Sequence, residues 1–485
     1  FARLCCKQAF PPKWSFGFCA SACEYTDLDN ADDKLYDFLN SVSMQDLECT
    51  GLYLSDSFAS ENGKCLFDWN TEKVASPKQL VKDFDQAGVH ILPRIKPALS
   101  ENHPMYDELC KNGAFVKNPD GTPFVTQLWN GLGSYIDFTN PKGYDFWKSQ
   151  LRTGLLDCGI NGLCDEFDIR DWAALAYGFG YGQIKARNIR PNLTYLMVKA
   201  SYEAQLEKAH DKRPYLSTRS GNIAVRRMAQ TWTGDNMTSW HDLYYGHYLG
   251  LTLSMSGMFF YGHNLGGSVG DMPSKELFLR WIQHGIFEPR FAIDSRTEDG
   301  SSVMPWSYPE IGDAVRDIFS QRKQLMPYLY SSAYNSVSYD EPMNAPLFLY
   351  YEDEDIEEDC ESFLVGRDLL ATCVLDEGIE NITAYLPEGD DWYLGSKYYK
   401  GGQNVSLHIP PTSKMPYFVR SGCVFPTDEG EYGFNSEQKL VFTVYPLKSG
   451  FFQSSFFDDD GESFEYKKGN CVRLFFSVVC EEDKV

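Results

Sequence analysis

The sequence lacks any apolar run long enough to cross a membrane. Its longest candidate, LGLTLSMSGMFFYG, is shorter than the ~18 to 20 residues of a membrane span and contains polar residues. Positive charge is also scarce, with 44 Lys and Arg against 68 Asp and Glu and a formal net charge of −24. Because no basic stripe is present to neutralise phosphates, we do not expect nucleic acid or an anionic membrane as a partner. A neutral or cationic substrate is favoured instead.

Three further features are missing. The 14 cysteines form no CxxC pair at zinc-binding spacing. His263 has no second His or carboxylate at ligand spacing, so we expect it to pack in the core, and we predict no metal and no cofactor. No basic and then apolar leader opens the chain, which begins abruptly at FARLCC. We therefore expect an N-terminal portion to be missing, and the cellular compartment stays open.

The first two thirds of the chain alternate between strand-like and helix-like segments. Strands or strand ends are predicted at TGLYLSDSF, GVHILPRIKP, INGLCDEFD, RPYLSTRSG, LTLSMSGMFFYGH and GIFEPRFAIDS. Helical spacing of apolar residues is found in SPKQLVKDFDQA, YDFWKSQLRTGLLDCG and LTYLMVKASYEAQLEKAHD. Such alternation indicates a parallel sheet, and polar residues at so many strand ends favour a (β/α)₈ barrel over a doubly wound sheet.

The pattern changes after about residue 330. Short β-runs broken by Gly and Pro, such as ITAYLPEGDDWYLGSKYYKGG and MPYFVRSGCVFP, are typical of antiparallel β-modules. A chain of 485 residues is also too long for one core of ordinary size. We predict a barrel over residues 1–335, a proximal antiparallel β-sandwich domain over 336–430, and part of a distal one over 431–485.

An ordered series of motifs resembles a known family. PPKWSFGF, IKPALSENHPMYDEL, SYIDFTNPKGYDFW, TWTGDNMTSW, SMSGMFFYGHNLGGSVG and ELFLRWIQHGIFEPRFAIDS, in this order, are similar to glycoside hydrolase family 31, the α-glucosidase and α-xylosidase family. In that family a β-sandwich precedes the barrel and two β-domains follow it. The resemblance therefore implies a partner for this chain, either a missing N-terminal β-sandwich domain or a separate chain.

The resemblance also implies a retaining α-glycosidase with two catalytic carboxyl groups. One attacks the sugar and forms a covalent ester, and the other protonates the leaving oxygen and then activates water. Asp235 in TWTGDN matches the family's acid/base. Residue type alone favours a cap of the following helix for Asp235, and the match of the surrounding motif favours the catalytic role. Trp232 and Arg219 match positions that line the family's sugar subsite.

The nucleophile position is ambiguous. GLCDEFDIRDW is shorter than the family pattern by about three residues, which are missing between Gly162 and Glu166. Residue type favours Asp165, whereas counting forward from Gly162 favours Glu166. Adjacent residues on a strand point to opposite faces, so only one of them faces the barrel mouth. Asp165 is our first choice, with Glu166 and the absence of any nucleophile as alternatives.

Four more residues are candidate sugar contacts. Asn264 stands where the family has an Asp, and Asp294 where it has a His, which moves a negative charge within the pocket. Asp56 and Lys96 lie at the ends of the first clear strand and of the next one, where the family contributes contacts. Each of these two is equally compatible with a structural role.

Three functions follow from these features. The first is a retaining α-glycosidase that hydrolyses terminal α-glucosyl or related sugars, with carbohydrate as its partner. The second is a transglycosylase that uses the same residues. The third is a catalytically inactive family member that binds carbohydrate or a protein.

Overall fold

The computed structural model describes residues 7–21, 23–59, 69–128, 131–165, 175–180, 183–297, 300–356, 361–433 and 436–481. It forms two compact units, which are described separately. We call Cys19–Ser41 with Cys49–Trp232 the N-terminal unit, and Phe1–Phe18, Val42–Glu48 and Thr233–Val485 together the C-terminal unit. Among the described residues, no helix has the length and apolar character that crossing a membrane requires.

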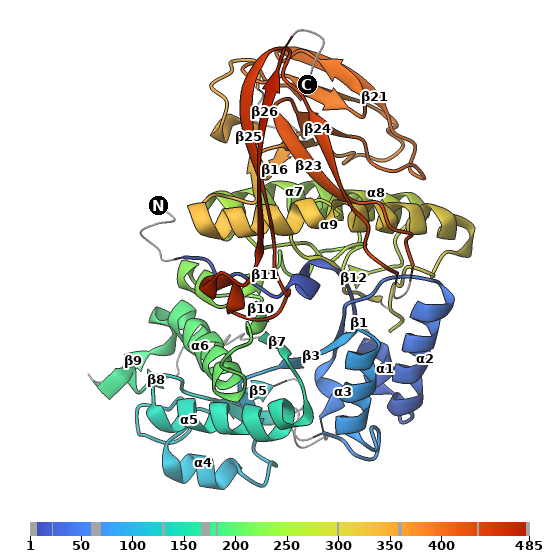
Figure 1. The fold of residues 1–485 in the computed structure, drawn as a ribbon. Coiled ribbons are helices and arrows are strands. Elements are labelled where there is room, and N and C mark those ends of the chain that lie inside the picture. The colour runs from blue at the N-terminus through green and yellow to red at the C-terminus, as the bar shows by residue number, and fades with distance from the viewer. Residues whose placement is uncertain are drawn as a thin grey trace. The chain divides into compact units, whose positions relative to one another are not determined.

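A parallel sheet forms the centre of the N-terminal unit (Figure 1). Its strands follow the order β11-β10-β7-β3-β2-β1, and each neighbouring pair is parallel. In chain order they are β1 (Phe18–Ser21), β2 (Gly51–Leu54), β3 (His90–Ile95), β7 (Gly162–Asp165), β10 (Tyr215–Thr218) and β11 (Gln230–Thr231). Because parallel neighbours need crossover connections, helices separate most of these strands along the chain.

The helices of this unit are α1 (Cys23–Asp27), α2 (Ala31–Met44), α3 (Pro77–Gln86), α4 (Tyr106–Asn112), α5 (Pro141–Gln150) and α6 (Arg190–Lys208). Helix α3 begins with Pro77 in its first turn, where the missing N–H costs no hydrogen bond. Its apolar residues Leu80, Val81 and Phe84 are spaced for one helical face, and all three are buried. Smaller strands complete the unit: β4 (Ala98–Ser100), β5 (Thr126–Leu128), β6 (Gly131–Tyr135), β8 (Leu175–Ala176) and β9 (Ile184–Lys185).

The parallel sheet is curled, and its concave face is identified by one hydrogen bond. The hydroxyl groups of Tyr53 on β2 and Tyr215 on β10 lie 3.0 Å apart, although β3 and β7 separate these strands in the sheet. Direct contact between side chains of such distant strands requires the sheet to curve around them. The face that carries Tyr53 and Tyr215 is therefore the concave interior.

The C-terminal unit begins with three helices and short strands. These are α7 (Trp240–Met255), β12 (Val269–Gly270), α8 (Lys275–Gly285), β13 (Phe291–Ile293), β14 (Arg296–Thr297) and α9 (Gly312–Tyr339). The strand predicted at LTLSMSGMFFYGH is wrong, because α7 continues to Met255 and the following residues 256–263 belong to no strand. Ser239 caps α7 by accepting from Asp242 N. Its buried positions, which include Leu243, His247 and Leu251, recur with helical rather than strand spacing.

Antiparallel strands follow α9, as predicted. Six form one sheet: β15 (Asn344–Pro346), β16 (Phe363–Val365), β17 (Leu369–Ala371), β22 (Tyr417–Arg420), β19 (Trp392–Leu394) and β20 (Lys397–Tyr399). Three pairs stand beside it: β18 (Asn381–Leu386) with β21 (Gln403–His408), β23 (Cys423–Asp428) with β24 (Leu440–Tyr445), and β25 (Gly450–Asp458) with β26 (Val472–Cys480).

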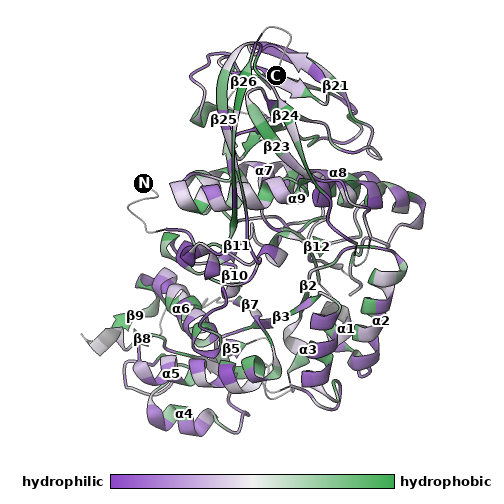
Figure 2. Ribbon diagram, in the orientation of Figure 1, coloured by the Kyte–Doolittle hydropathy of each residue, from purple (hydrophilic) through white to green (hydrophobic). Residues whose placement is uncertain are grey.

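Helix α9 supports these sheets from one side (Figure 1). The Tyr328 hydroxyl donates to Val365 O at 2.6 Å, and its ring stacks on Phe425 with centroids 4.3 Å apart. Figure 2 shows apolar residues along β23 and β24 above this helix. The domain boundaries near residues 335 and 430 stay predictions, and the first of them falls within α9.

Candidate functional site

Five predicted site residues follow five neighbouring strands of the parallel sheet. Because the carboxyl ends of parallel strands meet at one edge, these residues gather at that edge of the N-terminal unit. They are Asp56 after β2, Lys96 after β3, Asp165 at the end of β7, Arg219 after β10 and Trp232 after β11. The structure thus brings together, within one unit, residues that are far apart in the sequence.

These residues differ in exposure. Arg219 is exposed, Lys96 is half-buried, and Trp232 is buried with 5% of its surface accessible. Asp56 opens a short 3₁₀ turn, Asp56–Phe58, directly after β2. Lys96 and Arg219 are suited to donating hydrogen bonds to sugar hydroxyls, and the Trp232 indole is suited to packing against a sugar ring.

The strand register determines which way Asp165 points. Cys164 pairs with Ser217, which lies two residues after Tyr215 and therefore shares its face of the sheet. Cys164 also pairs with Arg94 of β3, and it belongs to the concave face. Asp165 is the next residue and therefore belongs to the opposite face of the sheet, which the helices cover.

The surroundings of Asp165 agree with that orientation. Its side chain is completely buried, and the Ser201 hydroxyl of α6, which accepts from Trp147 Nε1 at 3.0 Å, lies close to it. Burial raises the pKa of Asp165 to about 8, and Ser201 offsets a small part of that shift. Neither carboxyl oxygen accepts a well-aligned hydrogen bond from the described residues. At neutral pH Asp165 is mostly a neutral acid on the helix side of the sheet, which does not suit a nucleophile.

Glu166, the other candidate nucleophile, lies outside the described residues. The structure nevertheless changes the choice between the two acids. Asp165 was preferred for its residue type, but its face and its protonation both argue against attack on a sugar. Our first choice for the nucleophile therefore gives way to Glu166 in the proposal below.

Asp235 stands on an exposed turn of the C-terminal unit. Gly234 before it has φ 98°, a left-handed conformation that favours glycine. The turn is held on its inner side, where Thr233 Oγ1 donates to Asn236 Oδ1 at 3.0 Å and Asn264 Nδ2 donates to Gly234 O at 3.3 Å. Asp235 is thus an exposed residue of a turn whose neighbouring residues are held by hydrogen bonds.

Asn264 and Asp294 meet on one buried guanidinium. Arg290 donates from Nη1 to Asn264 Oδ1 at 3.1 Å and to His263 O at 2.8 Å, and its Nη2 lies 3.9 Å from Asp294 Oδ2. Ser268 Oγ also donates to Asp294 O at 3.1 Å. The carboxylate that the sequence adds at Asp294 is therefore compensated by Arg290.

Sequence reasoning missed Arg290, although a local signal was present. Arg290 lies four residues before Asp294 in EPRFAIDS, and only 2% of it is exposed. A buried Arg requires hydrogen-bond acceptors or a carboxylate nearby, and Asp294 was the acid nearest to it in this segment.

Potential metal-ligating atoms gather in two buried groups of the C-terminal unit. His247, His284 and Cys373 form one, and His263, His284 and Glu288 form the other. His263 was expected to lack a partner at ligand spacing, but folding brings Glu288 Oε1 to 3.2 Å from its Nδ1. A search of sequence spacing does not find partners that lie this far along the chain.

The chain matches two family models. The model of the glycosyl hydrolases family 31 TIM-barrel domain matches residues 8–332, and that of the family's C-terminal domain matches residues 340–425. The predicted fold, a barrel followed by antiparallel β-domains, is thereby confirmed, and the curled parallel sheet is part of that barrel.

Curated relatives are similar over nearly the whole chain. Alpha-glucosidase 2 of Bacillus thermoamyloliquefaciens is 26% identical over 506 residues, which covers 100% of this chain and 62% of the relative. Neutral alpha-glucosidase C of Mus musculus is 29% identical over 485 residues, which covers 96% of this chain and 53% of the relative. The chain thus spans less than two thirds of the length of these relatives.

A solved structure shares the fold. The structure of a GH31 dextranase from Flavobacterium johnsoniae, complexed with glucose, superposes with a TM-score of 0.89 at 23% identity. The superposition covers 98% of this chain and 60% of the dextranase chain.

Proposed function

The chain belongs to glycoside hydrolase family 31, and from that premise we propose that it is a retaining α-glycosidase. Its substrate class is terminal α-linked sugars, of the α-glucosyl or a related kind. The observation that carries the proposal is the exposed Asp235 carboxylate on its glycine turn, within a segment that the barrel model matches throughout.

Asp235 is proposed as the general acid/base. In the first step it protonates the glycosidic oxygen as the bond to the leaving group breaks, and in the second it removes a proton from water. A position on a turn lets the same carboxyl group serve a leaving sugar and then a water molecule. The family's matching Asp has this role.

Glu166 is proposed as the nucleophile. Asp165 faces the helices and is mostly neutral at pH 7, so of the two candidate acids we assign the attack on the sugar to Glu166. A retaining enzyme needs its two carboxyl groups about 5 to 5.5 Å apart. Asp165 then has a structural role as a neutral acid beneath α6.

The remaining predicted residues are proposed to bind the sugar. Lys96 and Arg219 supply hydrogen-bond donors at the carboxyl edge of the sheet, and Trp232 supplies an apolar wall. Asp56, directly after β2, is a further candidate at that edge. In the C-terminal unit, Asn264 offers an amide at the position where the family has a charged Asp.

The test is hydrolysis of nitrophenyl α-glucoside, α-galactoside and α-xyloside by the wild-type chain and three variants. Asp235→Asn is expected to lower kcat by roughly 10²- to 10⁴-fold, because nitrophenol leaves without an acid but the water of the second step loses its general base. Glu166→Gln is expected to lower it by roughly 10⁴-fold or more. Asp165→Asn is the matched control and is expected to retain activity, because a neutral amide replaces a neutral acid of the same shape.

One outcome would count against this function, and another against the choice of nucleophile. If the wild type releases no sugar from any of the three substrates yet binds carbohydrate, the chain is an inactive family member. If Asp165→Asn is inactive while Glu166→Gln is active, the assignment of the two acids is reversed. An added acceptor sugar distinguishes hydrolysis from transfer, since a transglycosylase forms a disaccharide product.

A further inference from the structure

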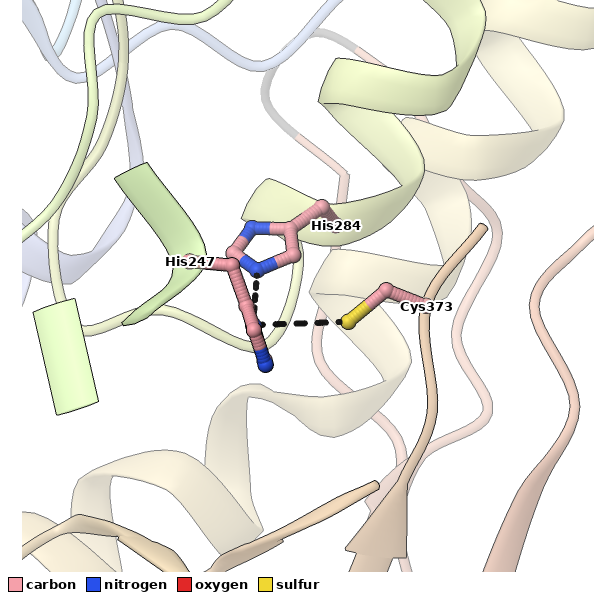
Figure 3. A group of neighbouring side chains, drawn as sticks. All are labelled: His247, His284 and Cys373. Atoms are coloured by element: carbon pink, nitrogen blue, oxygen red, sulfur yellow. Dashed lines mark hydrogen bonds between the residues drawn. The ribbon is translucent and has the colours of Figure 1, made fainter. Parts of the chain in front are cut away.

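Three buried side chains converge within the C-terminal unit, away from the proposed catalytic carboxylates in the sequence. His247 comes from α7, His284 from α8, and Cys373 follows β17 (Figure 3). Their exposed fractions are 2%, 3% and 1%. We call them the His-His-Cys cluster.

The distances within the cluster match the coordination sphere of a small cation. His247 Nδ1 lies 3.0 Å from His284 Nε2 and 3.6 Å from Cys373 Sγ, and all three potential ligand atoms lie within 4.8 Å of one another. Zinc binds imidazole nitrogen at about 2.0 to 2.1 Å and thiolate at about 2.3 Å, so neighbouring ligands of a tetrahedron are about 3.3 to 3.6 Å apart. Small adjustments of the side chains would therefore admit one Zn²⁺.

The three potential ligand atoms of the cluster face one another with few protons between them. Cys373 Sγ donates to Glu361 O at 3.5 Å and also contacts His247 Nδ1 at 3.6 Å. His247 Nδ1 and His284 Nε2 face each other and share a single proton. One cation would satisfy all three atoms at once, whereas one proton satisfies only one contact.

A carboxylate lies near His284 but makes no hydrogen bond to it unless metal binding draws the two groups together. His284 Nδ1, the nitrogen that points away from Cys373, lies 3.7 Å from Glu288 Oε1. Ligating imidazoles in proteins usually donate their other N–H to a carboxylate or carbonyl, which fixes the ring. Glu288 itself is held because its Oε2 accepts from His263 N at 3.0 Å.

The donor set selects the metal. Two imidazoles and a thiolate are ligands that Zn²⁺ prefers, whereas Ca²⁺ and Mg²⁺ prefer oxygen. Both imidazoles are buried in the C-terminal unit, with 2% of His247 and 3% of His284 exposed. The group formed by His263, His284 and Glu288 also contains His284, but it has a carboxylate where the His-His-Cys cluster has a thiolate. We therefore expect Glu288 to orient His284 rather than to bind the metal itself.

We propose that His247, His284 and Cys373 bind one structural Zn²⁺. Binding replaces the thiol S–H by a sulfur–zinc bond and releases that proton to solvent. The Glu361 carbonyl oxygen, 3.5 Å from Cys373 Sγ, or a water molecule completes the tetrahedron. The ion ties α7 and α8 to the segment after β17, across sequence separations of 37 and 126 residues.

The test measures metal binding by the whole chain, independently of glycosidase activity. The chain is purified without chelator, treated with excess Zn²⁺ and desalted, and its zinc is measured by mass spectrometry of the element. One zinc per chain is expected. No zinc after this treatment would overturn the proposal.

Variants locate the ion. Loss of an outer partner typically weakens metal binding about 10- to 100-fold, so Glu288→Gln is expected to fall in that range. Cys373→Ser removes a ligand and is expected to weaken Zn²⁺ binding by at least about 100-fold. Cys423→Ser is the matched control, since Cys423 is equally buried in β23 but outside the cluster. Unchanged zinc affinity in Cys373→Ser would overturn the proposal.

A spectroscopic measurement on the wild type covers the case in which a variant fails to fold. With Co²⁺ in place of Zn²⁺, a thiolate ligand gives a charge-transfer band in the near ultraviolet. X-ray absorption of the zinc form is expected to show one sulfur and two imidazole neighbours. A shell of nitrogen and oxygen alone would exclude the cluster.

Discussion

Replacing Asp165 by Asn tests whether this acid is buried, because burial makes the free energy of unfolding depend on pH. The carboxyl group has a pKa of about 8 in the folded chain, against a usual value of 3.8, because it is completely buried. Its protonated form is therefore favoured by folding. That contribution is fully present below pH 3.8 and is lost as the pH rises toward 8.

The size of the effect follows from the two pKa values. Between pH 4 and 8 the unfolded chain has released this proton and the folded chain still holds it, so the free energy of unfolding falls by about 1.4 kcal/mol per pH unit. From pH 5 to pH 7 the loss is about 3 kcal/mol. The amide introduced by Asp165→Asn does not titrate. The free energy of unfolding of this variant, relative to that of the wild type, is therefore expected to rise by the same amount from pH 5 to pH 7.

The assay is urea unfolding of both proteins at pH 5, 6 and 7, followed by tryptophan fluorescence. Other buried acids, such as Glu288, are present in both proteins and cancel in the difference. Asp157→Asn is the control: Lys208 holds the pKa of Asp157 below its usual value, so this variant is expected to differ from the wild type equally at pH 5 and pH 7. If the advantage of Asp165→Asn is also equal at both pH values, Asp165 titrates as a solvated carboxylate and the reasoning is refuted.

Three further variants test packing and charge in the C-terminal unit by urea unfolding. Gly250→Ala would place its Cβ 2.2 Å from Cε2 of Tyr261 and is expected to cost about 1 to 3 kcal/mol. Ser274→Ala removes the N-terminal cap of α8 and is expected to cost about 1 kcal/mol. Arg290→Met leaves the buried Asp294 without its cation and is expected to cost about 3 to 5 kcal/mol.

Each of these variants has a control. Gly312→Ala, where a Cβ meets nothing within 4 Å, should leave stability nearly unchanged. Ser274→Asp keeps a capping oxygen and should resemble the wild type at neutral pH. For Arg290→Met, wild-type stability would mean that the guanidinium does not compensate Asp294, and our account of that pair would fail.

The parallel sheet was predictable because its strands carry strong local signals. GLYL, HILPRI and YLST are short, largely apolar runs with polar residues at or directly after their ends, and each forms a strand. LTLSM carries a similar apolar and β-prone composition but lies in α7. There the helix is determined by the cap at Ser239 and by packing of the preceding turns, which a window centred on LTLSM does not include.

The choice between Asp165 and Glu166 was not predictable from the local sequence. Two adjacent acids on a strand are equivalent until pairing with the neighbouring strands determines which face is concave. That information lies in the register of Cys164 with Arg94 and Ser217.

The His-His-Cys cluster was hidden for a related reason. His247, His284 and Cys373 are brought together by the packing of two helices against a strand segment. A spacing search recognises ligands that share one loop or one helix, so it does not detect a set assembled by tertiary structure.

The most direct test of the proposed function is to identify the residue that carries the covalent sugar. The wild-type chain is incubated with an activated 5-fluoro-α-glucosyl fluoride, digested, and the peptide that spans residues 159–172 is sequenced by mass spectrometry. We predict a single glycosyl adduct on Glu166, with none on Asp165. An adduct on Asp165, or no adduct together with no hydrolysis of aryl α-glycosides, would contradict the account.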